Sequence, residues 1–158
     1  MALATQPVES VVDICTALVS YGCDIHADGV SPLHDAVKQN SPPLVAALLS
    51  ARHKFPDTVS RALSAWHDAT AYTPLHTAVR CGYHDCCRLL IDAGAHINAV
   101  CRDVSGQFVV TPLELAVVTC NKDIVQLLLQ SGCQVDKVGS RKATALLHAT
   151  SRGLAVVL

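Results

Sequence analysis

The chain has 158 residues, of which 51% are hydrophobic and 16% charged, and its formal net charge is -1. This length is sufficient for one domain with a buried core, and the hydrophobic content argues against a disordered chain. A net charge near zero argues against a general nucleic-acid-binding protein and against an electrostatic membrane anchor, because both need a strong excess of basic residues.

The N-terminus, MALATQPVES, has neither the basic region nor the apolar region of a signal peptide, and no apolar run approaches the roughly eighteen residues of a membrane span. Eight cysteines are present. However, small domains that depend on disulfides lack the helical apolar periodicity seen here. We therefore expect reduced thiols and an intracellular protein, cytoplasmic or nuclear, that does not bind membranes.

In chain order, the first predicted helix lies in DICTALVSYG, which starts at Asp13. A pair of segments then recurs: SPLHDAV from Ser31 with PLVAALLS from Pro43, TPLHTAV from Thr73 with DCCRLLIDAG from Asp85, and TPLELAV from Thr111 with DIVQLLLQSG from Asp123. A last partial copy, TALLHAT, starts at Thr144. Such recurrence predicts a protein built from stacked repeats.

The repeated segments carry the signals of two short helices. Thr or Ser followed by Pro favours a helix start, because the hydroxyl caps free amides and proline is tolerated in the first turn. Gly82 ends the first helix in a left-handed conformation, and Gly94 ends the second, with Gly22 and Gly132 at equivalent places. In two other units, Asn40 and Cys120 occupy the position that Gly82 has in its own unit. One helix pair cannot bury its own apolar faces, so we expect a solenoid.

This pattern resembles the ankyrin repeat, with Thr73-Pro74-Leu75-His76 and Gly94 to Ala99 matching its signature without a gap. The resemblance implies an all-α solenoid of antiparallel helix pairs with loop or β-hairpin fingers, forming one domain over residues 1–158. The expected units are residues 1–27 (partial), 28–70 (with an insertion), 71–108, 109–141 and 142–158 (truncated). Because the first ten residues carry Pro7 and little helical pattern, we expect no regular first helix in the first unit.

Two departures from the pattern predict local features. The insertion Arg52 to Asp68 replaces the turn of its unit, and Asp57 or Thr58 could cap a short helix there. Its apolar face would carry Val59, Ala62, Leu63 and Trp66. The finger between Asn98 and Thr111 is about five residues longer than the usual period.

Histidine and cysteine are the candidate metal ligands and nucleophiles. The resemblance implies that His34 and His76 tie backbone groups of neighbouring repeats together. A zinc site is disfavoured, because the chain has no CxxC motif and adjacent Cys86 and Cys87 would point about 100° apart on a helix. Catalytic and nucleotide-binding motifs are also missing from the sequence, so we expect no enzyme activity and no cofactor.

The resemblance implies that a partner protein binds the concave face, through residues before each Thr-Pro and at the end of each first helix. Tyr72, Phe108, Val110 and Val118 are expected to form an exposed apolar cluster there, as interface centres often do. Basic residues such as Arg80 would edge it. The full set of expected contact residues is Lys38, Gln39, Thr70, Tyr72, Arg80, Cys81, Gln107, Phe108, Val110, Val118, Thr119 and Arg141.

The sequence thus predicts a non-catalytic protein-interaction module, an adaptor or scaffold. One alternative is the substrate-recognition part of a cullin-RING ubiquitin-ligase adaptor, and another is a sensor that responds to zinc or thiols. By resemblance, Asn98 is a candidate for an asparagine hydroxylase, while the simpler interpretation is that it caps its own turn. The open last unit, from residue 142, is a candidate surface for self-association.

Overall fold

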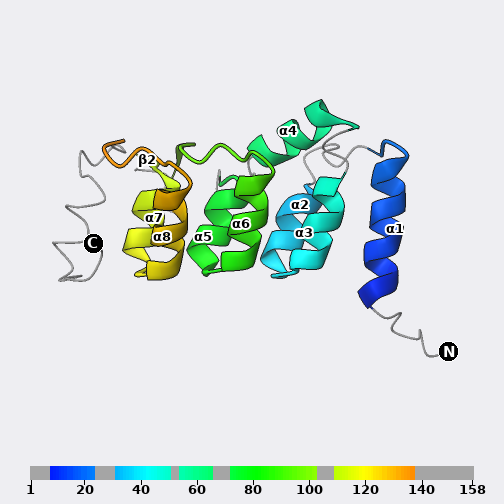
Figure 1. Ribbon diagram of the computed structural model, residues 1–158, viewed down its shortest axis with the longest axis horizontal. Coiled ribbons are helices and arrows are strands. Elements are labelled where there is room, and N and C mark those ends of the chain that lie inside the picture. The colour runs from blue at the N-terminus through cyan, green and yellow to red at the C-terminus, as the bar shows by residue number, and fades with distance from the viewer. Residues whose placement is uncertain (1–7, 24–30, 51–53, 66–71, 103–108, 138–158) are drawn as a thin grey trace.

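The computed structural model describes residues 8–23, 31–50, 54–65, 72–102 and 109–137. Helices dominate it, and a two-stranded hairpin interrupts them (Figure 1). The elements are α1 (Val8–Ser20), α2 (Pro32–Lys38), α3 (Pro42–Leu49), α4 (Pro56–Ser64), α5 (Pro74–Cys81), α6 (His84–Asp92), β1 (Cys101–Arg102), β2 (Val109–Val110), α7 (Pro112–Val118) and α8 (Lys122–Gln130).

The helices form two layers. Helices α2, α5 and α7 pack side by side in the first, which we call the inner layer, and α1, α3, α6 and α8 pack in the second, the outer layer. Each inner helix also contacts the outer helix that follows it in the chain. This arrangement confirms the predicted all-helical solenoid.

Side-chain caps begin two of the three inner helices. The Thr73 hydroxyl accepts a bond from the backbone N–H of His76 at 3.4 Å. Thr111 and Glu114 form a reciprocal capping box, with bonds of 3.2 Å and 2.7 Å. Ser31 makes no such bond, so the expected hydroxyl cap is wrong for α2, where Pro32 at the first position marks the start instead.

Backbones in the left-handed region end the helices, as predicted. Gly82 has φ 78° and Gly94 has φ 92°. Asn40 and Cys120 take the same conformation without being glycine, with φ 47° and 58°. The four positions show that helix ends are set by the repeat, even where the residue is not the favoured one.

The core repeats with the sequence. Three leucines, three alanines and three valines occupy equivalent places in the inner helices, and all nine are buried: Leu33, Ala36, Val37, Leu75, Ala78, Val79, Leu113, Ala116 and Val117. They face buried side chains of the outer layer, including Leu90 and Leu128. Stacking therefore buries apolar surface that a single helix pair would expose.

The insertion forms the predicted short helix, α4, with Val59, Ala62 and Leu63 buried. Two details of the prediction are wrong. Phe55 holds the cap position, so Asp57 and Thr58 lie within the first turn. The helix also ends at Ser64, because Ala65 adopts an extended conformation, and Trp66 lies outside the described residues.

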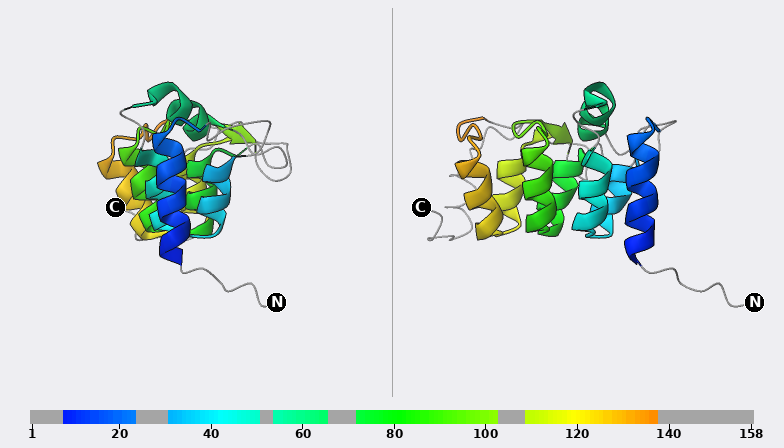
Figure 2. Two further views of the ribbon diagram at one scale, coloured as in Figure 1. Left: turned by 90° about the vertical axis from the view of Figure 1, so that its right-hand side faces the viewer. Right: turned by 45° about the vertical axis from the view of Figure 1, so that its right-hand side comes forward.

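Helix α4 lies across the ends of the helices in the two layers, in the region between α1 and α5 (Figures 1 and 2). The ammonium of Lys54 donates to the carbonyl oxygen of Ser20 at 2.9 Å, at the last residue of α1. A positive charge there is favourable, because the final carbonyls of a helix lack partners within it. The insertion thus ties α1 to the rest of the stack.

Helix α1 begins at Val8, earlier than the pattern from Asp13 indicated. Residues 8–10 therefore belong to the helix that packs on α3 in the outer layer, rather than to the place of a first helix. The enlarged finger contains the antiparallel hairpin, in which Cys101 pairs with Val110 and Arg102 with Val109. None of the described helices is long and apolar enough to cross a bilayer.

Candidate protein-binding surface

Six residues at the ends of the inner helices form a row in which core packing does not restrict the residue type. They directly follow the buried Leu, Ala and Val, and their chemistry differs from unit to unit. All are exposed except one half-buried valine. We call this set the inner-helix row: Lys38, Gln39, Arg80, Cys81, Val118 and Thr119.

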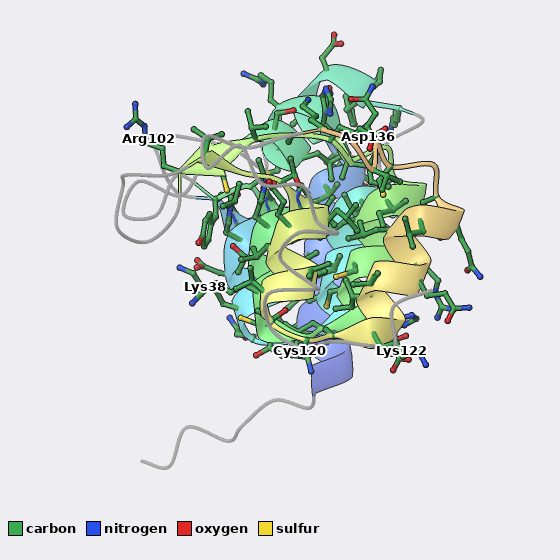
Figure 3. The ribbon with its side chains drawn as sticks, turned by 90° about the vertical axis from the view of Figure 1, so that its left-hand side faces the viewer. Lys38, Arg102, Cys120, Lys122 and Asp136 are labelled. Atoms are coloured by element: carbon green, nitrogen blue, oxygen red, sulfur yellow. The ribbon has the colours of Figure 1, made fainter. Side chains whose placement is uncertain are left out.

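The finger adds a third basic residue, Arg102, to Lys38 and Arg80 of this row. Arg102 on β1 is exposed, and Figure 3 shows it projecting on the same side of the stack as Lys38 on α2. Lys122, at the start of α8, lies toward the other side. Lys38 and Arg102 therefore lie on one side of the molecule. Arg80 occupies the place in α5 that Lys38 has in α2, and these basic groups suit acidic groups on a partner.

Tyr72 is buried, so the prediction that it belongs to an exposed apolar cluster is wrong. Its side chain is 2% exposed. The ring stacks on the imidazole of His76 with centroids 5.9 Å apart, and the guanidinium carbon of Arg80 lies 5.6 Å from the ring centroid. The aromatic ring is thus a packing and cation–π partner inside the repeat.

The rest of the predicted apolar cluster is only partly described. Val110 on β2 and Val118 at the end of α7 are both half-buried. The other predicted contact residues lie outside the described residues: Thr70, Gln107, Phe108 and Arg141.

His34 has the inter-repeat role that the resemblance implied, whereas the hydrogen bond of His76 with Thr73 lies within its own unit. Nε2 of His34 lies 2.8 Å from the carbonyl oxygen of Tyr72, in the next unit. Nδ1 of His76 lies 2.7 Å from the hydroxyl of Thr73. Burial lowers the pKa of His76 from 6.5 to about 4, although the nearby backbone of Val110 and Ala99 acts in the opposite direction. A neutral ring is therefore part of the folded structure at neutral pH.

Asn98 joins two units instead of capping its own turn. Its side-chain oxygen accepts a bond from the backbone N–H of Gln134 at 2.8 Å, and its backbone oxygen accepts one from the ammonium of Lys137 at 2.7 Å. The interpretation that Asn98 caps its own turn is therefore wrong, because the partner of its side chain lies in the next unit. Hydroxylation of Asn98 stays a prediction, and an enzyme would have to reach a half-buried side chain that already holds a neighbouring turn.

All eight cysteines lie in the described part of the chain, and all are free thiols. Cys86 and Cys87 are buried, and burial raises the pKa of both, to about 12 for Cys87. A thiol held in its protonated form is a poor nucleophile and a poor metal ligand. Among the residues described, no group of three or more His, Cys, Asp or Glu side chains is arranged to hold a metal ion.

Two surface features were missed by the sequence analysis. One is a polar groove of about 450 Å³ between the outer helices α6 and α8, lined by His84, Arg88, Asp123, Gln126, Leu127 and Gln130. The other is an exposed apolar stripe on α1, formed by Val11, Ile14 and Leu18 and continued by Tyr21. The second had a signal in the sequence, because apolar residues fill the core positions of a unit that shows no first helix.

Comparison with known proteins identifies the family. The sequence pattern described as Ankyrin repeats (3 copies) matches residues 50–139. A mouse protein, the B-cell lymphoma 3 protein homolog, is 31% identical over 151 residues, which is 93% of this chain and 32% of that protein. The glycerophosphocholine phosphodiesterase gde1 of Schizosaccharomyces pombe is 42% identical over 86 residues, 54% of this chain but 7% of the relative.

A solved structure agrees with these sequence matches. The ankyrin repeat domain of Bcl-3, described as a unique member of the IkappaB protein family, superposes with a TM-score of 0.75 at 31% identity. The match covers 92% of this chain and 61% of that domain structure. The chain thus spans under a third of each curated relative and under two thirds of the solved domain. With most of the chain matched in both sequence and fold, this protein belongs to the ankyrin-repeat family.

Proposed function

We propose that this chain is a non-catalytic adaptor or scaffold module that binds an acidic segment of an intracellular protein across the inner-helix row and the β1–β2 finger. Cytoplasm and nucleus both fit this role. The observation that carries the proposal is the contrast between buried and exposed positions of the three inner helices. Leu, Ala and Val are the same in each unit, whereas the two residues that follow differ each time.

Identical buried residues are what a repeating core requires, because every interface between units has the same shape. Exposed residues are free of that requirement, so their differences give each unit its own contact chemistry. Lys38 and Arg80 supply positive charge along the row, and Arg102 supplies it from the finger. Charge of one sign on one side speeds association with a complementary partner and sets its orientation.

The similarity to the Bcl-3 ankyrin domain supports a protein-interaction role of the same general kind. The similarity to the phosphodiesterase supports no catalytic role, because it covers only 7% of that enzyme. Two buried polar side chains are also used within their own repeat: His76 bonds to Thr73, and Glu114 caps its own helix. Such groups stabilise the fold and are not directed at a substrate.

The test compares two variants with equal changes in charge. Lys38→Glu/Arg80→Glu reverses two charges of the inner-helix row, whereas Arg88→Glu/Lys122→Glu reverses two exposed charges on outer helices. Each variant and the parent chain would be used to capture proteins from cell extract with quantitative mass spectrometry, after circular dichroism shows equal helicity. We expect the first variant to lose a specific set of proteins that the second retains.

Captured proteins would then be purified and their affinities measured directly at two salt concentrations. An acidic partner should bind the Lys38→Glu/Arg80→Glu variant at least about tenfold more weakly, and the difference should shrink at high salt. Equal losses for both variants, or equal retention by both, would refute binding at this row.

A further inference from the structure

Helix α1 exposes a continuous apolar stripe at the end of the stack. Val11 is 46% exposed, Ile14 58%, Leu18 50% and, just after the helix, Tyr21 91%. Their spacing of three, four and three residues places them along one side of the helix. Figure 2 shows α1 as the end face of the stack, packed on one side only.

The register of the repeat shows why this stripe is unusual. Counting back from the glycine that ends each outer helix, Ile14 and Leu18 correspond to Cys86 and Leu90 of α6 and to Ile124 and Leu128 of α8. Those four residues are 0% exposed. In α6 and α8 these positions pack against the inner helix of the same unit. Among the described residues, no inner helix precedes α1, so core-type side chains face outward.

The side of α1 that packs on α3 is separate from this stripe. Val19 is 4% exposed, and Val12 and Cys15 are partly buried. The helix therefore has two apolar sides, and the stack covers only one of them. A pair of such stripes would remove eight apolar side chains from water, which favours association.

We propose that the stripe is a homodimer interface, in which α1 of a second copy packs antiparallel to α1, on the side that an inner helix covers in α6 and α8. The spacing of the stripe is symmetric about Thr16: Ile14 and Leu18 lie two residues from it, and Val11 and Tyr21 lie five residues from it. In an antiparallel pair centred there, Ile14 faces Leu18 of the second copy, and Val11 faces its Tyr21. Each apolar side chain meets an apolar side chain, as a two-fold interface requires.

The charges of α1 permit this pairing. The helix has no basic residue, and Asp13 is rotated about 100° from Ile14, away from Leu18. Asp13 therefore does not fall on the stripe, so the apolar side chains that face each other bring no pair of charges together. A basic or acidic partner helix would find no complementary charge on the stripe, so the symmetric, uncharged surface favours a second copy.

The test uses charged substitutions at two exposed positions of the full 158-residue chain. Sedimentation velocity over a range of concentrations, up to about 200 µM, would measure self-association, since a small interface predicts a weak dimer. Ile14→Lys or Leu18→Glu alone should weaken the dimer at least about tenfold. Leu129→Lys, at a residue 37% exposed on α8, should leave it unchanged.

Mixing the variants tests the register. Ile14→Lys mixed with Leu18→Glu should restore a dimer, because in the antiparallel pair the new lysine faces the new glutamate and the other contact stays apolar. Ile14→Lys mixed with Ile14→Glu should not restore it, because positions 14 do not face each other. Equal circular dichroism of all variants would show that they are folded.

Three results would overturn the proposal: a wild-type chain that stays monomeric at all concentrations, a dimer that survives both single substitutions, or rescue by the Ile14→Lys and Ile14→Glu mixture. If the monomeric chain instead recruits a helix of another protein to Ile14 and Leu18, the stripe is a binding site for that protein and the homodimer is refuted.

Discussion

Nε2 of His34 lies 2.8 Å from the carbonyl oxygen of Tyr72, a residue 38 positions farther along the chain. A carbonyl can only accept, so Nε2 must carry the proton and donate it. Both groups are buried, and the bond connects two successive repeats. The bond is therefore a fixed link between two units. The histidine that makes it lies in the first turn of its inner helix, α2.

Replacing His34 by Phe keeps a ring in place and removes the donor. We expect the free energy of unfolding to fall by about 1–3 kcal/mol, because the Tyr72 carbonyl is left buried without this partner. Urea unfolding followed by circular dichroism would measure it. Asp35→Ala, at the exposed neighbour, is the control and should change stability by less than about 0.5 kcal/mol. A similar loss in both variants would contradict a specific role for the bond.

Stability should depend on pH through His76. Its pKa is lowered from 6.5 to about 4. Between these values the unfolded chain binds more protons than the folded one, so stability is complete above pH 6.5 and falls as pH drops toward 4. The lowered pKa of His76 should account for about 3 kcal/mol of the free energy of unfolding that is lost between these pH values.

The measurement is the slope of unfolding free energy against pH in the parent chain and in His76→Gln. The variant is expected to be less stable but to show a shallower slope over this range, because the titrating group is gone. Parallel curves would mean that other groups cause the dependence.

Alanine substitutions at Gly22 and Gly94 should distinguish the cost of a strained backbone from the cost of a steric clash. Their φ values are similar, 88° and 92°. A Cβ on Gly22 would lie 3.1 Å from the ring of Phe55, whereas nothing lies within 4 Å of one on Gly94. Alanine at Gly94 should cost about 1–2 kcal/mol from the left-handed conformation alone. Alanine at Gly22 should cost more, because it also disturbs the segment before α4, and thermal unfolding of both variants would show the difference. Equal costs would mean that Phe55 moves aside without penalty.

Cys120 offers a stabilising substitution. It is exposed and has φ 58°, a conformation that glycine adopts at the equivalent Gly82. Cys120→Gly should raise the free energy of unfolding by about 0.5–1 kcal/mol. Gln39→Gly is the matched control, because Gln39 has φ -76° and gains nothing from glycine, so it should lose stability. A loss in Cys120→Gly would indicate that the cysteine side chain makes a favourable contact.

The repeated core could be predicted from sequence because the same residue types recur at every interface. Leu33, Leu75 and Leu113 each follow a Ser-Pro or Thr-Pro pair, and all are buried. Tyr72 could not be placed in this way. Its position before Thr-Pro indicates a surface residue, but the direction of its ring depends on stacking with His76 and on the Arg80 side chain, which only the packed structure determines.

The exposure of α1 shows a second limit. Apolar periodicity reports which side of a helix suits burial, and Ile14 and Leu18 have the same pattern as their buried counterparts in α6 and α8. Burial itself requires a neighbouring element, and the periodicity of α1 contains no information about whether one is present. The periodicity of α1 therefore predicts a helix but not which of its sides the stack covers.

The cysteines give a direct test of the proposed binding surface. Cys81 in the inner-helix row and Cys23 after α1 are exposed, whereas Cys87 is buried with its pKa raised to about 12. Iodoacetamide at pH 8 should therefore modify Cys81 and Cys23 in the folded protein, and Cys87 only in urea, since the thiolate is the reactive form. Peptide mass spectrometry would measure each rate.

Adding a captured partner should then slow the modification of Cys81 and leave that of Cys23 unchanged, because only Cys81 belongs to the inner-helix row. A partner that protects Cys23 but not Cys81 would place its binding site near α1 and would refute the inner-helix row. Rapid modification of Cys87 without urea would show that the α5–α6 interface opens, and the assay would then no longer distinguish binding from local unfolding.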